Sequence, residues 1–556
     1  VVYLYFHQYS FISKTQPQAI SRFLSKFSIL SVLGIAAVTC FIFYAYWEKS
    51  QKSQLEKMIR MALAAVFLVL AAVLLKTGYL LSQVGITAML YLSILFILNF
   101  KISRLSMIVV SVLTIFEFGY NAYLSQVTFG YDDVHKFADA TVSVKRVTDN
   151  IQENADQKFY RIATDFAYSR TVPSLVSYPG LSTFSSSLER STMDHFAFMG
   201  DLGVNAATQY SNGTPLTDAL YGVRYFMSAK DFDPKEIEAN PDKMYFYRFT
   251  DRFDLHRYFT DKVYEDKRYV VYKNPNSFPL AYGTNSLVRN IQFGANNAFA
   301  NQNIILNSME GHQKANNDTV EYFKPLAFSS IETENVIEEK VNKETGEAIY
   351  KRADSSKDAI IRYKVTPRTN YTYYFFTPVS LIQNQDYSVL LNNKWLLNAK
   401  IFTQRQIWQL TDQTENQETV IEFRFRTDHI DMSNAGVYRA DVDQIQQVLE
   451  NRKKQGLHVT KFSNTHIVGD VSITDDSNYM MTSIPYSDGW KVKVDGKFVK
   501  TEKAWNAFLS FPISKGNHKV EFVFRQKGVI LGALLSIVSV AYLVIQMRRN
   551  RSDEEQ

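Results

Sequence analysis

Cysteine is almost absent from this sequence, whose 556 residues include one, Cys40. Secreted eukaryotic domains are commonly held by disulfides, so this scarcity argues against that class. The chain also lacks a phosphate-binding Gly-x-x-x-x-Gly-Lys loop, a nucleophile elbow and a dinucleotide fingerprint, which disfavours an ATP-driven machine and a soluble hydrolase. The closest histidine pair, His458 and His466, has neither a cysteine partner nor helical spacing, so no zinc site is expected. No cofactor is evident.

A strong excess of one charge is missing as well. The net charge at pH 7 is +6, and part of this excess lies beside the apolar segments. Such a balance gives no reason to expect nucleic acid as a partner.

Long apolar runs, in contrast, are present and unevenly placed. A bilayer core of roughly 30 Å needs about 20 apolar residues of helix. The candidate spans are residues 27–47, 61–75, 77–100, 105–124 and 527–547. We predict a multi-domain membrane protein, with an α-helical transmembrane bundle of at least four spans in residues 1–124 and one C-terminal span. Between them we expect a large external region of α/β plus β-sandwich structure.

Lysine and arginine predict the orientation, because short cytoplasmic loops retain positive charge. Basic residues fill the loops at 49–60 and 101–104 and the tail at 548–556, whereas those at 14–26 oppose this assignment. The large middle region is then external and the C-terminus cytoplasmic. With the scarcity of cysteine, this favours a multi-pass protein of a bacterial cell membrane.

The external region divides by pattern at a breaker cluster, Asn274-Pro-Asn-Ser-Phe-Pro. Residues 125–275 mix short helices and strands, which predicts an α/β domain, and residues 276–526 are rich in alternating strands, which predicts a β-sandwich-like domain. Asp495-Gly496 predicts a tight hairpin, because a type I′ turn needs positive φ at both positions. Strands are expected at 158–163, 268–272, 359–365, 371–376, 420–426 and 518–524, and helices at 191–200, 234–239 and 441–452.

The chain begins with Val1 rather than methionine, and residues 1–6 read like the end of another apolar helix. This start has no basic segment and no small-residue cleavage site, so it is not a signal peptide. We expect further spans upstream.

Several phrases resemble the YfhO family of bacterial membrane proteins. Glu117-Phe-Gly-Tyr-Asn-Ala-Tyr is similar to an acid-then-Asn-Ala segment of that family, and Pro179-Gly-Leu-Ser-Thr-Phe-Ser-Ser to its Phe-Ser-Ser motif. Thr214-Pro-Leu-Thr-Asp-Ala-Leu-Tyr-Gly-Val-Arg-Tyr resembles its Leu-Gly-Val-Lys-Tyr motif. Asn274-Pro-Asn-Ser-Phe-Pro-Leu-Ala-Tyr-Gly and the hairpin after Ser487-Asp-Gly-Trp resemble two further elements. Their order and spacing over residues 105–547 carry the resemblance.

The resemblance implies a polytopic GT-C-like glycosyltransferase. Such enzymes take a sugar from a polyprenyl-phosphate donor and add it to an envelope polymer, lipoteichoic acid in relatives. They place an essential Asp or Glu in the first external loop. We expect that loop upstream of Val1, so no catalytic residue is assigned.

Glu117, Asn121, Asp132 and Asp133 are the candidate substrate-binding residues. A carboxylate near hydrocarbon is costly, so Glu117 is expected to face protein, a cavity or a ligand. Asn121, four residues on, shares its helical face. The alternative for both is a structural role at the interface. Asp132 and Asp133 could hold a divalent cation beside a phosphate, or form a solvated turn.

Four tryptophans, Trp395, Trp408, Trp490 and Trp505, lie in the predicted sandwich. Exposed rings there could stack on sugars, but tryptophan in such domains is normally buried. Sugar stacking would need a common exposed face.

Three functions stay open. The first is a membrane glycosyltransferase, with membrane lipids, a polyprenyl-phosphate sugar donor and a cell-wall or teichoic acid polymer as partners, and a carboxylate as general base on the acceptor hydroxyl. The second is a membrane-anchored protein that binds or scaffolds envelope polymer. The third is a lipid or solute transporter, suggested by the number of spans and by Glu117.

Overall fold

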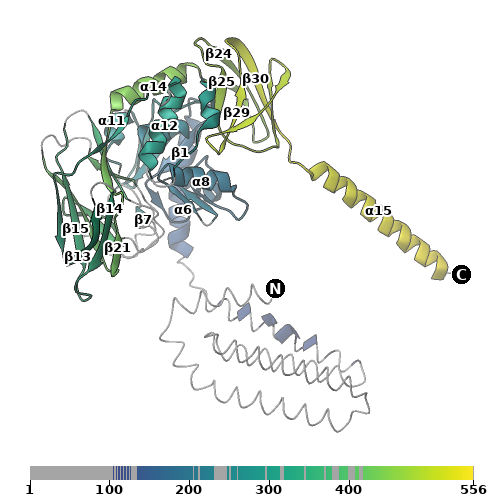
Figure 1. Ribbon diagram of the computed structural model, residues 1–556. Coiled ribbons are helices and arrows are strands. Elements are labelled where there is room, and N and C mark those ends of the chain that lie inside the picture. The colour runs from purple at the N-terminus through teal and green to yellow at the C-terminus, as the bar shows by residue number, and fades with distance from the viewer. Residues whose placement is uncertain are drawn as a thin grey trace, which may run out of the picture. The chain divides into compact units, whose positions relative to one another are not determined.

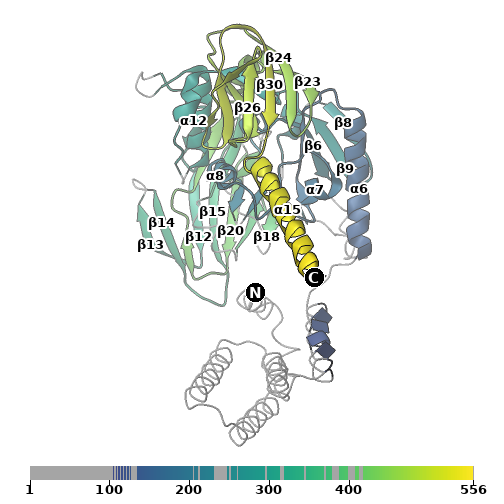
Figure 2. The same ribbon diagram turned by 90° about the vertical axis from the view of Figure 1, so that its right-hand side faces the viewer.

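The computed structural model describes most of the chain after position 133 (Figure 1; Figure 2). It describes isolated positions between 104 and 126, all helical, and residues 134–204, 206–210, 213–230, 247–248, 252–259, 261–294, 297–313, 318–342, 346–368, 371–377, 387–398, 407–411 and 417–554. Residues 134–556 group into one compact unit, separate from residues 1–133. The predicted spans at 27–47, 61–75 and 77–100 and the predicted helix at 234–239 lie outside the described residues, and the span at 105–124 is described only in part.

The compact unit opens with a helix packed on a mixed sheet. Helix α6 (Val134–Glu153) buries Val144, Val147 and Ile151, whose spacing places them on one face. The sheet order is β1–β6–β9–β8 (Arg161–Thr164, Val223–Ala229, Tyr269–Lys273, Asp261–Glu265). Strands β1 and β6 are parallel and the other pairs antiparallel, and Figure 2 shows α6 beside β8 and β9. The predicted strand at 268–272 is confirmed, whereas the one at 158–163 begins only at Arg161.

Short elements connect the strands of this first sheet. They are α7 (Val172–Val176), α8 (Arg190–Phe198), α9 (Pro215–Leu220), α11 (Leu255–Tyr258), a pair β2–β7 (Phe166–Ala167, Tyr247–Arg248) and a small sheet β3–β5–β4 (Thr183–Phe184, Ala207–Gln209, Leu202–Val204). The predicted helix at 191–200 is confirmed as α8.

A helical layer follows, in which α12 (Ala298–Glu310) and α14 (Val442–Lys454) lie next to each other (Figure 1). The predicted helix at 441–452 is confirmed as α14. Asp441 caps its start by accepting a hydrogen bond from the Gln444 backbone N–H at 3.4 Å. Both helices contribute to one hydrophobic core that also contains Phe226 and Phe508. This core therefore includes residues from both sides of the boundary predicted near 275, and that boundary stays a prediction.

A first pair of sheets packs around a core rich in aromatic rings, including Tyr363, Phe375 and Phe423. Strand β15 buries alternate residues from Ala359 to Val365, as its period-two pattern predicts. One sheet has the order β11–β22–β16–β19 (Phe323–Leu326, Gly436–Ala440, Thr372–Phe376, Ile407–Thr411). The other has the order β12–β15–β20–β17–β18 (Ser330–Glu334, Ala359–Val365, Thr419–Phe425, Tyr387–Leu391, Lys394–Asn398), with a small sheet β13–β14–β21 (Val336–Asn342, Glu347–Arg352, His429–Asp431) beside it.

A second pair of sheets, the C-terminal sandwich, encloses its own core, so the region predicted as one sandwich contains two. Its sheets are β10–β25–β29–β28 (Ala281–Thr284, Tyr479–Pro485, Phe508–Pro512, Glu502–Ala504) and β23–β24–β30–β26–β27 (His458–Phe462, His466–Ile473, Gly516–Phe524, Trp490–Val494, Lys497–Val499). The hairpin between β26 and β27 is confirmed, and Asp495 and Gly496 at its turn have φ values of 50° and 79°.

The described chain ends in α15 (Val529–Glu554). Among the described residues, one helical segment, Val529–Met547, is long and apolar enough to cross a membrane, with a mean hydropathy of 2.3. It matches the C-terminal span predicted at 527–547, and only four residues separate it from β30.

Candidate functional site

The four predicted substrate-binding residues, Glu117, Asn121, Asp132 and Asp133, lie outside the described residues. Within the described part, no cluster of three or more His, Cys, Asp or Glu side chains could hold a metal ion.

The predicted tryptophans do not share an exposed face. Trp408 and Trp505 are 0% and 1% exposed, so both belong to the core, as the alternative reading expected. Trp490 is partly buried and its ring centroid lies 5.1 Å from that of Phe524. The side chain of Trp395 lies outside the described residues.

Two of the segments that resemble family motifs are joined to each other. Thr214 begins α9 with a capping box: its hydroxyl accepts from the Thr217 N–H at 3.2 Å, and the Thr217 hydroxyl accepts from the Thr214 N–H at 2.9 Å. After this helix, Val223 O accepts from the Asn274 side-chain amide at 3.0 Å. The Phe278 N–H donates to Ala219 O at 3.1 Å. The breaker cluster is thus fixed against α9 and β6.

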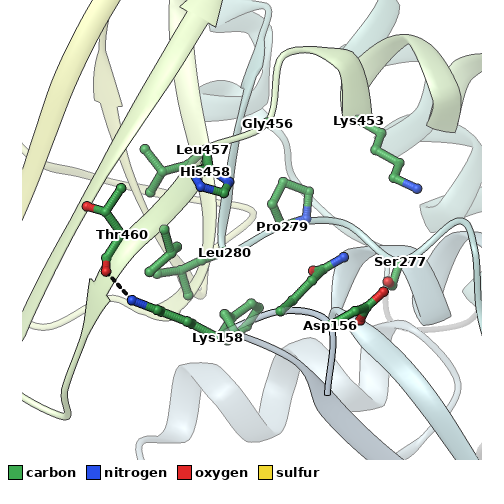
Figure 3. A pocket seen from close by; sticks show the side chains of 13 residues that line it. Asp156, Lys158, Ser277, Pro279, Leu280, Lys453, Gly456, Leu457, His458 and Thr460 are labelled. Atoms are coloured by element: carbon green, nitrogen blue, oxygen red, sulfur yellow. Dashed lines mark hydrogen bonds between the residues drawn. The ribbon is translucent and has the colours of Figure 1, made fainter. Parts of the chain in front are cut away.

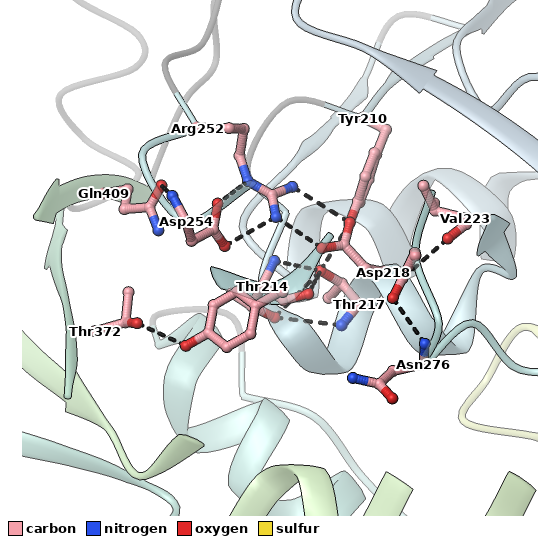
Figure 4. Close-up of polar contacts among 12 residues, drawn as sticks. Tyr210, Thr214, Thr217, Asp218, Val223, Arg252, Asp254, Asn276, Thr372 and Gln409 are labelled. Atoms are coloured by element: carbon pink, nitrogen blue, oxygen red, sulfur yellow. Dashed lines mark hydrogen bonds and ion pairs between the residues drawn. The ribbon is translucent and has the colours of Figure 1, made fainter. Parts of the chain in front are cut away.

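A buried ion network stands beside α9 (Figure 4). The Arg252 guanidinium donates to both Asp254 oxygens at 2.7 and 2.9 Å and to Asp218 Oδ2 at 2.7 Å. All three side chains are at most 2% exposed. Tyr210 Oη also donates to Asp218 Oδ1 at 2.6 Å. The network is almost closed to solvent, and it joins α9 to the segment that contains Arg252 and Asp254.

Asp156 forms a second, more accessible ion cluster before β1. Its carboxylate lies 2.5 Å from Arg224 Nη2 and 3.0 Å from Lys273 Nζ. Burial raises the Asp156 pKa, but the hydrogen bonds and charges of the two cations outweigh it and lower the pKa to about 2. The carboxylate is therefore ionised at neutral pH, with its charge offset by two cations.

Asp156 lines a cleft of about 580 Å³ (Figure 3). Three segments far apart in the sequence form its walls: residues 156–159 before β1, residues 277–280 of the breaker cluster, and residues 453–460 at the end of α14 and the start of β23. Its apolar lining includes Phe159, Pro279 and Leu457. Its polar lining includes Gln157 and His458. His466, the other member of the histidine pair, instead places Nε2 3.0 Å from Glu521 Oε1.

Lys158 and Lys453 give the cleft its charge. Their ammonium groups donate to the backbone carbonyls of Thr460 and Pro275, respectively. Neither lysine forms an ion pair with another residue of the described part, although Glu450 and Asp156 act on Lys453 from a longer distance. Burial and then the charge of Arg224 lower the Lys453 pKa from its ordinary value.

Arg161 adds a third cation behind the cleft wall. Its guanidinium donates to Tyr221 O at 2.6 Å and Ser483 O at 3.0 Å, and lies 5.0 Å from the centroid of the Phe159 ring. Desolvation lowers its pKa to about 10, so it stays charged at neutral pH. The cleft is thus positively charged, with apolar surface beside hydrogen-bonding groups. That combination suits an anionic ligand with polar and apolar faces, such as a sugar or polyol phosphate.

Local sequence patterns do not predict this cleft, because Lys158 and Lys453 are nearly 300 residues apart. The one available signal was the breaker cluster at 274–279, whose motif resemblance marked a wall of the cleft without indicating its partners.

Comparison with known proteins identifies the family. A family model described as "Bacterial membrane protein YfhO" matches residues 18–536. The chain belongs to the YfhO family. A related protein, the "Uncharacterized protein YfhO" of Bacillus subtilis (strain 168), is 26% identical over 121 residues, which cover 22% of this chain and 14% of that relative. The match thus spans well under two thirds of the relative's length.

Solved structures give weaker likenesses. The β-glucuronidase from Ruminococcus gnavus is 8% identical, with a TM-score of 0.15 and coverage of 38% of this chain and 46% of that chain. An anti-sigma factor domain-containing protein is 12% identical, with a TM-score of 0.11 and coverage of 31% and 76%. At these values neither likeness supports a statement about function.

Proposed function

We propose that this YfhO-family protein is a membrane glycosyltransferase of the bacterial envelope and that the cleft holds its anionic acceptor polymer. The donor is a polyprenyl-phosphate sugar, and the acceptor is a polyol-phosphate polymer of the teichoic acid type. The observation that supports an anionic acceptor is that Lys158 and Lys453 in the cleft donate to backbone carbonyls and not to carboxylates.

A phosphodiester fits the charge of this site. At about 4 Å, a lysine and a phosphate attract by roughly 1 kcal/mol in water and about 4 kcal/mol at an effective dielectric constant of 20. Since each 1.4 kcal/mol changes affinity tenfold, loss of one lysine should weaken binding by about tenfold. Asp156 does not cancel this attraction, because Arg224 and Lys273 already offset its charge.

The remaining roles are proposed from residue chemistry and from the family resemblance together. Glu117 and Asn121 are proposed to contact the sugar of the donor, and Asp132 and Asp133 to hold a divalent cation beside its phosphate. The compact unit is proposed to be extracellular and the C-terminus cytoplasmic. The general base on the acceptor hydroxyl is proposed to be a carboxylate.

A binding or scaffold protein is the second candidate, because the same cleft would retain polymer without any sugar transfer. The two functions differ in the polymer itself: a scaffold changes where the polymer lies, whereas a transferase changes its sugar content.

The test is a strain that lacks the gene, complemented with the full-length protein or its variants. We expect sugar per phosphate in purified teichoic acid to fall in the deletion strain and to return with the wild type. The double variant Lys158→Gln/Lys453→Gln should restore it poorly, whereas Lys515→Gln, a change on an exposed loop of the C-terminal sandwich, should restore it fully. Unchanged sugar content in the deletion strain would remove the transferase proposal.

A further inference from the structure

The link between the C-terminal sandwich and its candidate span is short. Strand β30 ends at Phe524 and α15 begins at Val529. An extended chain covers at most about 3.6 Å per residue, so five steps reach at most about 18 Å. The Arg525 N–H donates to Gly489 O at 2.9 Å, which holds the first linker residue on the sandwich. With α15 across a bilayer, this end of the sandwich must lie at or near the headgroups.

Several turns meet at this end of the sandwich. The Phe524 N–H donates to Thr465 O at 2.8 Å, which places the β23–β24 turn beside the linker, and the contact of Arg525 with Gly489 places the β25–β26 turn there too. We define the membrane-proximal end as residues 462–465, 486–490 and 524–527.

The membrane-proximal end is rich in aromatic side chains. Phe462 is 42% exposed, although it is a large apolar residue on a strand. Trp490 packs on Phe524, and both rings are partly exposed. Tyr486 donates its hydroxyl to Asp488 at 3.1 Å. Tryptophan and tyrosine concentrate at the level of lipid headgroups, because their rings are apolar and their N–H and O–H groups are polar.

The charges at this end are mainly positive. Arg525 and Lys527 are exposed, and Lys503 lies 5.4 Å from the centroid of the Tyr486 ring. Within the three defined segments the acid is Asp488, and Lys527 pairs with it at 2.7 Å. Glu502, next to Lys503 in the sequence, also acts on Tyr486, so the positive excess of this end comes chiefly from Arg525. A basic residue near an anionic bilayer surface contributes about 1 kcal/mol.

We propose that the membrane-proximal end rests on the bilayer surface, with its aromatic rings at headgroup depth and Arg525 and Lys527 against the phosphates of anionic lipids. The linker, the rings and the charges lie on one end of one sandwich, and together they fit a lipid surface. The proposal is independent of the proposed sugar transfer and holds on either side of the membrane.

This contact between the membrane-proximal end and the bilayer would also set the distance of the cleft from the membrane surface. Thr460 of the cleft wall donates its hydroxyl to Val468 O at 3.2 Å, and Val468 pairs with Glu521 of β30. Glu521 precedes Phe524 by three residues, or about 10 Å of strand. The cleft would then open close above the headgroups, within reach of a polymer that is itself anchored in the membrane.

The test uses the full chain in lipid nanodiscs. Because Cys40 is the single cysteine, Cys40→Ser gives a background for one fluorescent label. The label is placed by Asn464→Cys at the membrane-proximal end or by Lys515→Cys as the control, just before the opposite end of β30. Nine strand residues separate the two ends by about 30 Å, so lipid-borne quenchers should quench the label at 464 at least about threefold more strongly. Equal and weak quenching at both positions would overturn the proposal.

A second comparison tests the charges. Quenching at 464 should be stronger in nanodiscs with phosphatidylglycerol than in nanodiscs with phosphatidylcholine alone. Arg525→Gln/Lys527→Gln should abolish that difference, and Lys515→Gln should keep it. A difference that survives in the double variant would overturn the role of the two basic side chains, and an unchanged thermal unfolding curve would show that each variant is folded.

Discussion

Removing Arg252 should destabilise the compact unit more than any change to its surface ion pairs. The guanidinium is 2% exposed and lies between Asp218 and Asp254, which are equally buried. Removing one partner of a buried ion pair costs about 3–5 kcal/mol, because the other charge stays buried without compensation. Arg252→Met leaves two such carboxylates, so we expect a loss near 5 kcal/mol at pH 7.

The loss should depend on pH. Burial raises the Asp218 pKa above its ordinary value, and the charge and hydrogen bonds of Arg252 act against this rise. Without Arg252 the Asp218 pKa must rise further. A carboxyl group whose pKa is higher in the folded than in the unfolded protein contributes stability at low pH. That contribution is lost as the pH rises through the pKa of the folded state. Arg252→Met should therefore lose more stability at pH 8 than at pH 5.

The assay is urea unfolding of the purified full chain in detergent, followed by tryptophan fluorescence. Trp408 is a suitable reporter, since its neighbour Gln409 accepts a hydrogen bond from the Asp254 N–H at 3.3 Å. The control is Arg268→Met, which breaks an exposed pair with Asp139 at 2.6 Å. We expect that variant to lose no more than about 1 kcal/mol. Equal losses in the two variants at pH 7 would refute the reasoning.

Three further predictions concern stability. A Cβ on Gly213 would lie 1.8 Å from the Arg252 guanidinium, whereas a Cβ on Gly294 meets nothing within 4 Å. Gly213→Ala should therefore lower the urea midpoint by the equivalent of about 1–3 kcal/mol, whereas Gly294→Ala should leave it unchanged. Equal urea midpoints for the two variants would contradict this prediction. The folded protein lowers the Asp156 pKa to about 2, so the ionised carboxylate stabilises the fold above its ordinary pKa, and this stabilisation is lost between about pH 4 and 2. Asp156→Asn should therefore make the free energy of unfolding depend less on pH in that range. An acid unfolding curve identical to that of the wild type would contradict this prediction. Asp495→Ala should cost about 1 kcal/mol of hairpin stability, because φ at this position is 50° and alanine rarely adopts that conformation. Asp495→Asn should cost less, because asparagine tolerates it better. Equal urea midpoints for the two variants would contradict this prediction.

Local patterns predicted individual elements well. Strand β15 followed from its period-two alternation, because one face of each strand is buried. The helix predicted at 441–452 is confirmed as α14, which Asp441 caps, and the hairpin turn followed from Asp495-Gly496. In each case the deciding interactions lie within about a dozen residues of sequence.

The larger arrangement was not predictable in the same way. The strands of both sandwiches have the same character, and the partition depends on β10 pairing with β25 nearly 200 residues later. The pairing of Arg252 with Asp218 and the approach of Lys158 to the end of α14 are likewise long-range. Nothing in the residue types near Lys158 indicates a partner, so the cleft was missed. The predicted site at Glu117 stays a prediction, outside the described residues.

The most direct test of acceptor binding is the affinity of the purified full chain for a poly(glycerol phosphate), measured by calorimetry at low and high salt. We predict saturable binding that weakens as salt screens the charges. Binding should fall at least about tenfold in Lys158→Gln/Lys453→Gln and stay unchanged in Lys515→Gln. Equal affinity of the double variant and the wild type, or no binding at low salt, would contradict the cleft as the polymer site.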